Sequence, residues 1–345
     1  MKKLLLIGET LTHEGIGGKF LRALQSEDIA EEWTSYVQYT SSAINYSPSM
    51  STLRGKLFYR MFDKRSLEWW GFQRKLLKVI ATYEPDLILV TGILPISSQV
   101  FTAARESGSY FVNYLTDDPW NPIHKRNSFI KNISKYDHIF STKQNLRQRL
   151  KSHGASSTSW LPFAFEPMNH EPPENVRPDL YESPDLIFVG TGAKERVKWL
   201  TPLADIPQIS RQIYGNNWKN IKVPNWDVAA PVTGKDYCSV LYHAKITLGI
   251  LREANHDLST MRSYEIGAIG ACGLYQDTYE HRNLLQGYPD VGFFKTPNEL
   301  RSRVMLLLQN AALRQDLRAI AAKAIRKSEH TYKARLKQIL RIVAS

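Results

Sequence analysis

The most informative stretch of this sequence runs from Asp257 to Gly273 and reads DLSTMRSYEIGAIGACG. We expect a loop around Asp257, then a helix that begins at Glu265, and then a strand over Ala271–Gln276. Small residues along that helix permit close packing and a close approach of the backbone to a ligand. A helix that leads into a buried strand in this way is typical of α/β proteins, whose ligands bind beyond the carboxyl ends of the strands.

Three polar side chains in this stretch match a ligand that carries hydroxyls and phosphate. A carboxylate at Glu265 can accept hydrogen bonds from two ribose hydroxyls, Asp257 can reach a sugar hydroxyl, and Arg262 can meet a phosphate. The alternative is an ordinary helix whose N-terminal Glu is favoured by the helix dipole.

Strand and helix patterns alternate along almost the whole chain. Apolar runs such as Leu87–Val90 predict strands buried on both faces of a parallel sheet. The expected strands are Lys3–Ile7, Tyr36–Tyr39, Leu87–Val90, Tyr110–Leu115, His138–Ser141 and Ser157–Leu161, then Asp185–Val189, Ser210–Tyr214, Ala244–Leu251, Ala271–Gln276 and Gly292–Phe294. Helical patterns cover Gly17–Gln25 and most of Leu53–Tyr83, and continue with little interruption from Glu299 onwards.

Five prolines fall between residues 165 and 185, among polar residues with little apolar content. This composition predicts a semi-rigid linker, and a chain of 345 residues is long enough for two domains. We therefore expect two Rossmann-like, doubly wound α/β domains that face each other across a cleft. Their predicted ranges are 1–168 for the first domain, 169–185 for the linker, 186–328 for the second domain and 329–345 for a C-terminal helix.

The chain carries 45 Lys and Arg against 33 Asp and Glu, which gives a formal net charge of +12. This excess favours an anionic partner such as nucleotide phosphates, an anionic membrane face or nucleic acid, although solvated basic helix faces would also contribute. No apolar run approaches the roughly 18 residues of a membrane span, and the first apolar run is too short for a signal peptide. Cys238 and Cys272 lack the spacing of a disulfide framework or a zinc site. These features fit a cytosolic protein.

Two glycine-bearing loops follow predicted strands. In the first, Gly17 and Gly18 would let the backbone approach a phosphate or substrate at the start of a helix. The spacing is neither that of a dinucleotide fingerprint nor that of a P-loop, and an ordinary strand-to-helix turn is equally compatible. In the second, Gly190 and Thr191, with Arg196 close behind, could cradle a diphosphate, and a surface turn with solvated bases is the alternative.

Two adjacent carboxylates, Asp117 and Asp118, follow the strand Tyr110–Leu115 and precede Pro119. At the edge of a cleft such a pair is suited to proton transfer. The alternative is an Asx turn that ends the strand before the proline.

Several motifs together resemble the GT-B glycosyltransferases. The run Arg262–Gly273 resembles their R-x-(F/Y)-E…A-x-G signature, and more narrowly that of a group-1-like branch with spore-maturation glycosyltransferase-like proteins. The tail His330-Thr331-Tyr332-Lys333-Ala334-Arg335 is similar to the HTY-x-x-R ending of that branch. Phe188-Val189-Gly190, Ile213-Tyr214-Gly215 with Trp218, and Asp117-Asp118-Pro119 occur in the same order. The resemblance implies a GT-B architecture in which the C-terminal helix crosses back to the first domain.

The resemblance also implies roles for these residues. A Glu-x7-Glu motif binds the donor in related retaining enzymes, and here it reads Asp257-x7-Glu265, with Asp in place of the first Glu. Glu265 would hold the donor ribose, and Asp257 would lie near the transferred sugar as a catalytic residue. Either carboxylate of the Asp117–Asp118 pair would be the catalytic base if the enzyme inverts, and an acceptor contact if it retains.

Further positions would bind the donor diphosphate in such an enzyme. Gly190, Thr191 and Arg196 would lie near it, and Gly17 and Gly18 would face the same phosphates or the acceptor. GT-B enzymes use a nucleotide sugar as co-substrate and no further cofactor, and no bound metal is expected, because the leaving diphosphate is stabilised by helix N-termini and basic residues.

The implied activity is transfer of a sugar from a nucleotide sugar to an acceptor. A lipid-linked acceptor or a glycan is favoured, with peripheral association at the inner face of a membrane, and a protein or modified DNA base is an alternative. A non-catalytic nucleotide- or sugar-binding protein and a nucleotide-sugar epimerase would use the same fold.

Overall fold

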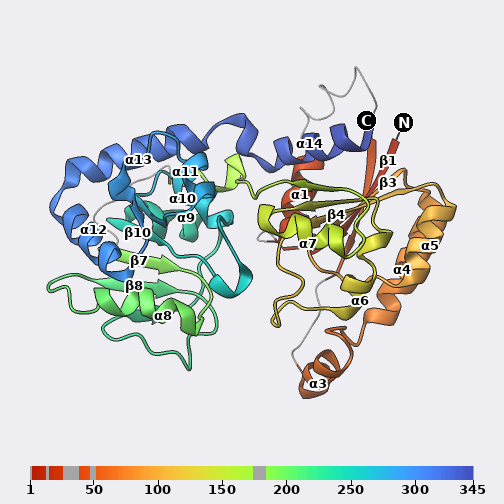
Figure 1. Ribbon diagram of the computed structural model, residues 1–345, viewed down its shortest axis with the longest axis horizontal. Helices are drawn as coiled ribbons and strands as arrows, with labels where there is room; N and C mark the ends of the chain where they lie inside the picture. The colour runs from red at the N-terminus through yellow and green to blue at the C-terminus, as the bar shows by residue number, and fades with distance from the viewer. Residues whose placement is uncertain (1, 13–14, 26–38, 47–51, 174–183, 345) are drawn as a thin grey trace. The chain divides into compact units, whose positions relative to one another are not determined.

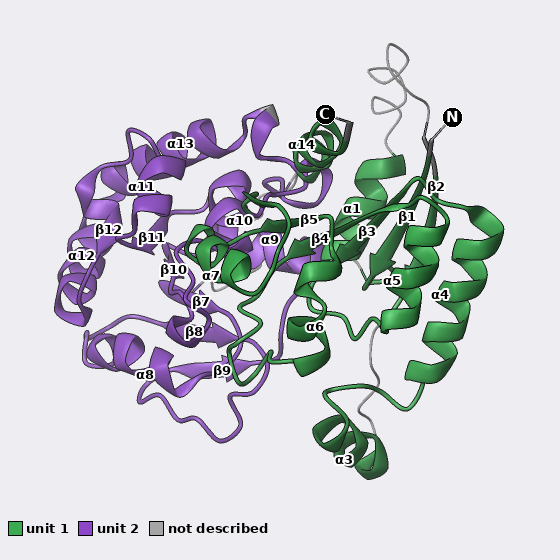
Figure 2. Cartoon of the chain, turned by 45° about the vertical axis from the view of Figure 1, so that its right-hand side comes forward, with its two compact units in different colours: residues 1–162, 332–345 green, residues 163–331 purple. Residues whose placement is uncertain are grey.

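The computed structural model describes residues 2–12, 15–25, 39–46, 52–173 and 184–344 (Figure 1). The chain forms two compact units (Figure 2), of which unit 1 contains residues 1–162 and 332–345, and unit 2 contains residues 163–331. The chain thus leaves unit 1 at Pro162, whereas the sequence pattern places the domain boundary at 168. Most of the predicted linker, residues 174–183, lies outside the described residues.

Unit 1 is built on a parallel six-stranded sheet with the strand order β2-β1-β3-β4-β5-β6. Long apolar runs account for its central strands, because every residue of β3 and β5 is buried. The strands are β1 (Lys2–Gly8), β2 (Tyr39–Asn45), β3 (Leu87–Thr91), β4 (Tyr110–Leu115), β5 (His138–Ser141) and β6 (Thr158–Trp160).

Helices flank the sheet of unit 1, and several begin at a side chain that caps the helix. Thr52 and Ser97 each accept a hydrogen bond from a backbone N–H in the first turn of the helix that follows. The helices are α1 (Ile16–Gln25), α3 (Leu53–Met61), α4 (Trp69–Tyr83), α5 (Ser98–Glu106), α6 (Asn127–Lys131), α7 (Arg147–Ser152) and α14 (Tyr332–Ala344).

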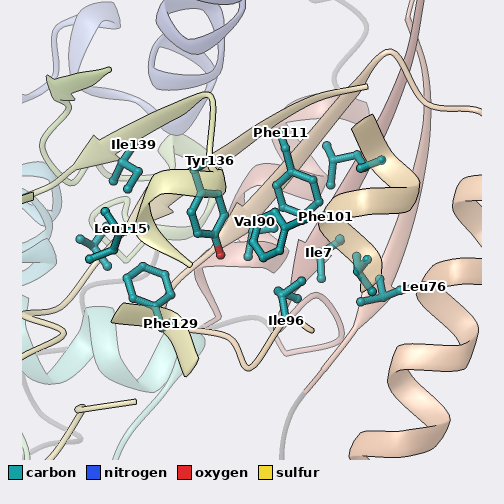
Figure 3. Packing of buried hydrophobic residues seen from close by; sticks show 14 of the residues in the cluster. Ile7, Leu76, Val90, Ile96, Phe101, Phe111, Leu115, Phe129, Tyr136 and Ile139 are labelled. Atoms are coloured by element: carbon teal, nitrogen blue, oxygen red, sulfur yellow. The ribbon is translucent and has the colours of Figure 1, made fainter. Parts of the chain in front are cut away.

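A hydrophobic core of unit 1 lies between one face of the sheet and a set of helices that includes α4, α5 and α6 (Figure 3). Aromatic rings fill its centre, where Phe101 packs against Phe111 and Tyr136 with ring centroids 4.6 and 4.9 Å apart. Burial raises the pKa of Tyr136 far above the ordinary value of a tyrosine. The C-terminal helix α14 belongs to this unit and packs against α1, where Phe20 meets Tyr332 edge to face.

Unit 2 repeats the design with a second parallel six-stranded sheet, in the order β12-β11-β10-β7-β8-β9. The strands are β7 (Leu186–Val189), β8 (Arg211–Tyr214), β9 (Asp227–Ala229), β10 (Ile246–Gly249), β11 (Gly273–Gln276) and β12 (Phe293–Phe294). The helices are α8 (Lys194–Leu200), α9 (Gly234–His243), α10 (Met261–Ile269), α11 (Tyr279–Leu284), α12 (Pro297–Gln309) and α13 (Ala311–Ile325). Two Rossmann-like α/β units are therefore present, as the alternation of patterns predicts.

Several details differ from the sequence-based expectation. The helical pattern Leu53–Tyr83 is interrupted, and two helices, α3 and α4, are joined by a turn in which Asp63 and Lys64 have positive φ. The strand expected at Tyr36–Tyr39 falls almost entirely on residues outside the described part, and β2 begins at Tyr39. Strand β9 is short and partly exposed, so it carries no apolar run by which it could be predicted. Among the described residues, no helix is both long and apolar enough to cross a membrane.

Candidate functional site in unit 2

Helix α10 begins at Met261, so the predicted start at Glu265 is wrong by one helical turn. Thr260 is the N-cap, and its side chain and that of Ser263 form a reciprocal capping box at the first turn. This pattern satisfies the backbone N–H groups of Thr260 and Ser263 locally and fixes where the helix starts. Glu265 therefore lies in the second turn, on a buried face of the helix.

The carboxylate of Glu265 is the centre of a buried polar cluster, and its side chain is only 3% exposed. Its Oε2 accepts a hydrogen bond from the Tyr237 hydroxyl at 2.9 Å and one from the Arg262 guanidinium at 3.0 Å. The Arg262 guanidinium also lies over the Tyr237 ring, 4.6 Å from its centroid. Burial raises the pKa of Tyr237 well above its usual value, so the hydroxyl stays protonated and donates.

His170 completes this cluster from a segment far away in the sequence. Its Nδ1 accepts a hydrogen bond from the backbone N–H of Glu166 at 3.0 Å, so in the neutral ring the proton lies on Nε2. That Nε2 lies 3.4 Å from Oε1 of Glu265. Donors from three different segments therefore converge on one carboxylate, which is how a buried negative charge is stabilised. Sequence reasoning missed both His170 and Tyr237, because neither lies in a recognisable motif.

The loop before α10 is fixed by helix α11 and the strand that precedes it. The Ser263 hydroxyl accepts from the Thr260 N–H and lies 2.7 Å from Nε2 of His281, whose Nδ1 donates to the carbonyl of Gln276 at 2.7 Å. Burial lowers the pKa of His281 to about 4, so the ring is neutral near pH 7 and accepts the Ser263 proton. The Ser259 hydroxyl donates to the buried carboxylate of Glu280 at 2.5 Å. The start of α10 is thus held rigidly.

Asp257 lies in the same loop, and it is 9% exposed. Its Oδ1 accepts from the amide of Asn255 at 2.9 Å, and His256 between them has a left-handed backbone with φ of 52°. The structure therefore brings Asp257, Arg262 and Glu265 into one region of unit 2, around the N-terminus of α10.

The buried guanidinium of Arg196 stabilises the Gly190–Thr191 loop by hydrogen bonds to backbone carbonyls. Its Nη1 donates to the carbonyl of Thr191 at 2.5 Å and its Nη2 to that of Ile250 at 3.4 Å. Burial lowers the pKa of Arg196 to about 10. A Cβ on Gly190 would lie 2.8 Å from the Phe188 ring. The contacts of Gly190 and Arg196 are therefore those of a braced loop after β7, in which Thr191 is exposed.

Gly17 and Gly18 lie in unit 1, where their missing side chains make room for the chain itself. A Cβ on Gly17 would lie 2.8 Å from the carbonyl oxygen of Glu9, and one on Gly18 would lie 2.4 Å from that of Thr12. The Gly18 N–H also donates to the Glu9 carbonyl at 2.9 Å. Close packing of α1 against the preceding loop is enough to require both glycines.

Asp117 and Asp118 of unit 1 have different surroundings. Asp118 is 1% exposed, and its Oδ1 accepts from the Trp120 N–H at 2.8 Å, which is the Asx turn considered as the alternative. The Asp117 side chain is 32% exposed, and its Oδ1 lies 3.5 Å from Nε2 of His124. Of the two, Asp117 is the carboxylate that solvent reaches.

Comparisons with known proteins agree with this architecture. Residues 195–341 match a family model described as glycosyl transferase-like. Among solved structures, the chain is similar to sucrose-phosphate synthase from Thermosynechococcus elongatus, with a TM-score of 0.67, 13% identity, and coverage of 100% of this chain and 98% of that one.

Two further solved structures cover the chain from end to end. T4 phage BGT in complex with its UDP-glucose substrate has a TM-score of 0.61 and 13% identity, with coverage of 99% of each chain. The N-terminal domain of Candida albicans trehalose-6-phosphate phosphatase has a TM-score of 0.64 and 11% identity, with coverage of 100% of this chain and 97% of that one. A search of curated proteins found no match in sequence. At these identities the likeness shows the fold, which is the two-unit α/β architecture of GT-B proteins.

Proposed function

We propose that the protein is a glycosyltransferase that binds a nucleotide sugar in unit 2, around the N-terminus of α10. The observation that carries this proposal is the buried Glu265 carboxylate, on which Tyr237, Arg262 and His170 converge. A carboxylate removed from water is costly, and the fold of unit 2 does not require one at this position. A ligand whose hydroxyls hydrogen-bond to this preorganised carboxylate would explain why a carboxylate is buried at this position.

The donor would be bound by groups with separate roles. Glu265 would accept hydrogen bonds from the ribose hydroxyls, and Arg262, with a side chain that is 32% exposed, would contact the diphosphate. The N-terminus of α10 has no acidic residue in its first turn, so its dipole favours the phosphates. Thr191 would add a contact from the loop after β7. The leaving diphosphate would then be stabilised by fixed dipoles and a guanidinium, without a metal ion.

The chemistry would involve Asp257 and one carboxylate of the Asp117–Asp118 pair. Asp257 would lie beside the transferred sugar and orient one of its hydroxyls. Asp117 would be the base or the acceptor contact, because it is the exposed member of its pair. The match to a glycosyl transferase-like model over residues 195–341 supports a donor site in unit 2. We further propose that the protein belongs to the group-1-like branch that includes spore-maturation glycosyltransferase-like proteins.

A panel of nucleotide sugars tests the donor site directly. We expect one nucleotide sugar to raise the melting temperature of the wild-type protein, and Glu265→Gln to weaken its binding about 10–100-fold, since a hydrogen bond to a charged group contributes about 1.5–3 kcal/mol. Asp290→Asn is the matched control, because Asp290 is a carboxylate whose side chain is 84% exposed and which pairs with Arg282. Equal affinity of Glu265→Gln and Asp290→Asn for every donor that binds would refute the assignment.

Turnover separates transfer from the alternatives on the same fold. With a bound donor and a set of lipid, glycan, protein and DNA acceptors, a transferase releases nucleoside diphosphate only when an acceptor is present. Conversion of the donor to its epimer without acceptor would identify an epimerase. Tight binding with neither reaction would identify a non-catalytic nucleotide-binding protein.

A further inference from the structure

Helix α3 of unit 1 exposes a ridge of large apolar side chains. Leu53, Leu57 and Met61 are 84%, 58% and 67% exposed, and their spacing of four residues places them along one face of the helix. Gly55 is the only residue of α3 that is buried in the described structure. Both ribbon views show α3 at the lower edge of unit 1, away from the sheet (Figures 1 and 2).

Cationic side chains flank this apolar ridge on both sides. At 100° per residue, Arg54 lies on one side of it, and Lys56 and Arg60 lie on the other, and all three are exposed. Between residues 53 and 65 the sequence has five Lys and Arg and one Asp. An apolar ridge between rows of cations is the pattern of a helix that lies on an anionic lipid surface.

Two further exposed apolar residues lie on segments joined to the end of α3. Phe62, which is 48% exposed, stacks on Phe58 with centroids 4.4 Å apart. Ile123 is 58% exposed, and the Lys64 ammonium fixes its loop by donating to the carbonyls of Pro122 and Ile123 at 2.8 and 2.6 Å. The apolar surface therefore continues from α3 to the loop that follows β4.

We propose that α3, together with Phe62 and Ile123, is a docking surface for an anionic lipid bilayer. A second copy of the chain is disfavoured as the occupant, because a symmetric contact would bring two patches of the same positive charge together. Nucleic acid would engage the cations and leave the ridge of Leu53, Leu57 and Met61 in water. A bilayer satisfies both features, since acyl chains accept the ridge and anionic headgroups accept the cations.

Hydrogen bonds connect this surface to the region around the loop that contains Asp117, the candidate base or acceptor contact. The Asp63 carboxylate accepts from the N–H groups of Asn127 and Ser128 at 2.6 and 2.8 Å, and the Arg126 guanidinium donates to the Lys64 carbonyl at 2.7 Å. Asn127 and Ser128 begin α6, and Arg126 ends the loop between β4 and α6, in which Asp117 lies. The docking surface thereby deepens the proposed function, on which this step rests, because it makes a lipid-borne molecule the acceptor class.

Vesicle flotation tests the docking surface without any nucleotide sugar. The wild-type protein is expected to float with vesicles that contain about one third phosphatidylserine and to float poorly with pure phosphatidylcholine vesicles. Arg54→Glu with Lys56→Glu is expected to weaken binding to the anionic vesicles about 25-fold or more, since each basic residue near the surface contributes roughly fivefold. Leu57→Ser with Met61→Ser is expected to weaken it about tenfold.

Matched controls come from exposed positions of unit 2. Lys219→Glu with Lys222→Glu changes the charge equally, and Met305→Ser with Leu306→Ser removes two apolar side chains that are 42% and 44% exposed. Vesicle binding that falls equally in the α3 variants and their controls would overturn the docking surface. So would binding of duplex DNA that depends on Arg54 and Lys56 while vesicles are ignored, or concentration-dependent dimerisation that Leu57→Ser with Met61→Ser abolishes.

The proposed function and the docking surface are tested by independent measurements. Nucleotide-sugar stabilisation of the protein is measured in unit 2 and is expected to be unchanged in every α3 variant. Loss of vesicle binding with intact donor binding therefore concerns α3 alone. Intact vesicle binding without any donor binding would leave the docking surface in place and remove the lipid-borne acceptor.

Discussion

Acidification from pH 7 to pH 5 should destabilise unit 2 through one buried imidazole, that of His281. The ring is fully buried, with its Nδ1–H on the Gln276 carbonyl and its Nε2 accepting from Ser263 at the start of α10. Protonation of Nε2 would remove that acceptor and place a charge in the core. Folding therefore disfavours the protonated ring, and burial holds the pKa of His281 at about 4, against 6.5 in the unfolded chain.

The magnitude follows from these two values. A folded-state pKa below the unfolded one means that the unfolded chain binds more protons, so stability falls as the pH drops from 6.5 towards 4. The full difference of about 2.5 pKa units corresponds to about 3 kcal/mol, reached below pH 4. At pH 5 the linkage relation gives a loss of about 2 kcal/mol, and at pH 7.5 the loss is close to zero.

The assay has to read the two units separately, because a two-unit chain need not unfold in one step. Urea denaturation followed by a short protease pulse, with the surviving fragments assigned by mass spectrometry to residues 1–162 or 163–331, provides this. His281→Gln is expected to be less stable at pH 7, and to lose about 2 kcal/mol less than the wild type between pH 7 and pH 5 in unit 2. The difference between the two proteins cancels all other titrating groups.

His138 is the matched control for this experiment. It is buried in unit 1, where burial also lowers its pKa to about 4. His138→Gln should therefore remove the same pH dependence from unit 1 and leave that of unit 2 unchanged. If His281→Gln and the wild type lose equal stability in unit 2 between pH 7 and pH 5, then the buried ring does not titrate as this reasoning requires.

Three further changes test the loop after β7 and the donor site. Gly190→Ala should destabilise unit 2 by about 1–3 kcal/mol in urea denaturation, because the added Cβ would lie 2.8 Å from the Phe188 ring. The control is Gly71→Ala, at an exposed helical position where an added Cβ would meet nothing within 4 Å, and it should stabilise unit 1 by about 0.5–1 kcal/mol. Equal effects of the two would contradict the packing. Tyr237→Phe should lower the stability of unit 2 by about 1.5–3 kcal/mol in the same assay and weaken donor binding, because the buried Glu265 carboxylate loses a donor; unchanged stability and affinity would show that this hydrogen bond contributes nothing. Donor binding and turnover should persist in excess EDTA, and loss that Mg²⁺ or Mn²⁺ restores would show that the site needs a metal.

The architecture could be predicted because the signal for it is local. A run such as Leu87–Val90 is apolar at every position, which is what a strand covered on both faces requires. Boundaries that depend on contacts elsewhere could not be predicted in this way. The interruption between α3 and α4 is stabilised by Asp63 and Lys64, whose partners lie about sixty residues further along the chain. No periodicity within Leu53–Tyr83 reports those contacts.

The candidate site, too, was predictable only where its contacts are local in sequence. Arg262 and Glu265 are three residues apart on one helix, so their pairing is visible in the sequence. The capping box formed by Thr260 and Ser263 could not be predicted from the usual signature, because its third helical position holds Ser263 and not Glu or Gln. His170 lies 95 residues from Glu265, inside the proline-rich segment 165–185, and its contact with Glu265 depends on the fold alone.

The glycines support the proposed donor site less strongly than Glu265 does. A ligand-binding loop and a tightly packed loop both need a residue without Cβ, so a glycine after a strand favours neither. In this protein Gly17 and Gly190 each abut the chain itself, and a Cβ on Gly267 in α10 would lie 2.6 Å from Ile325 of α13. Packing therefore accounts for all three. Packing does not account for Glu265, because an apolar side chain there would need none of its three donors. The donor site consequently depends on Glu265, and its replacement is the experiment that decides it.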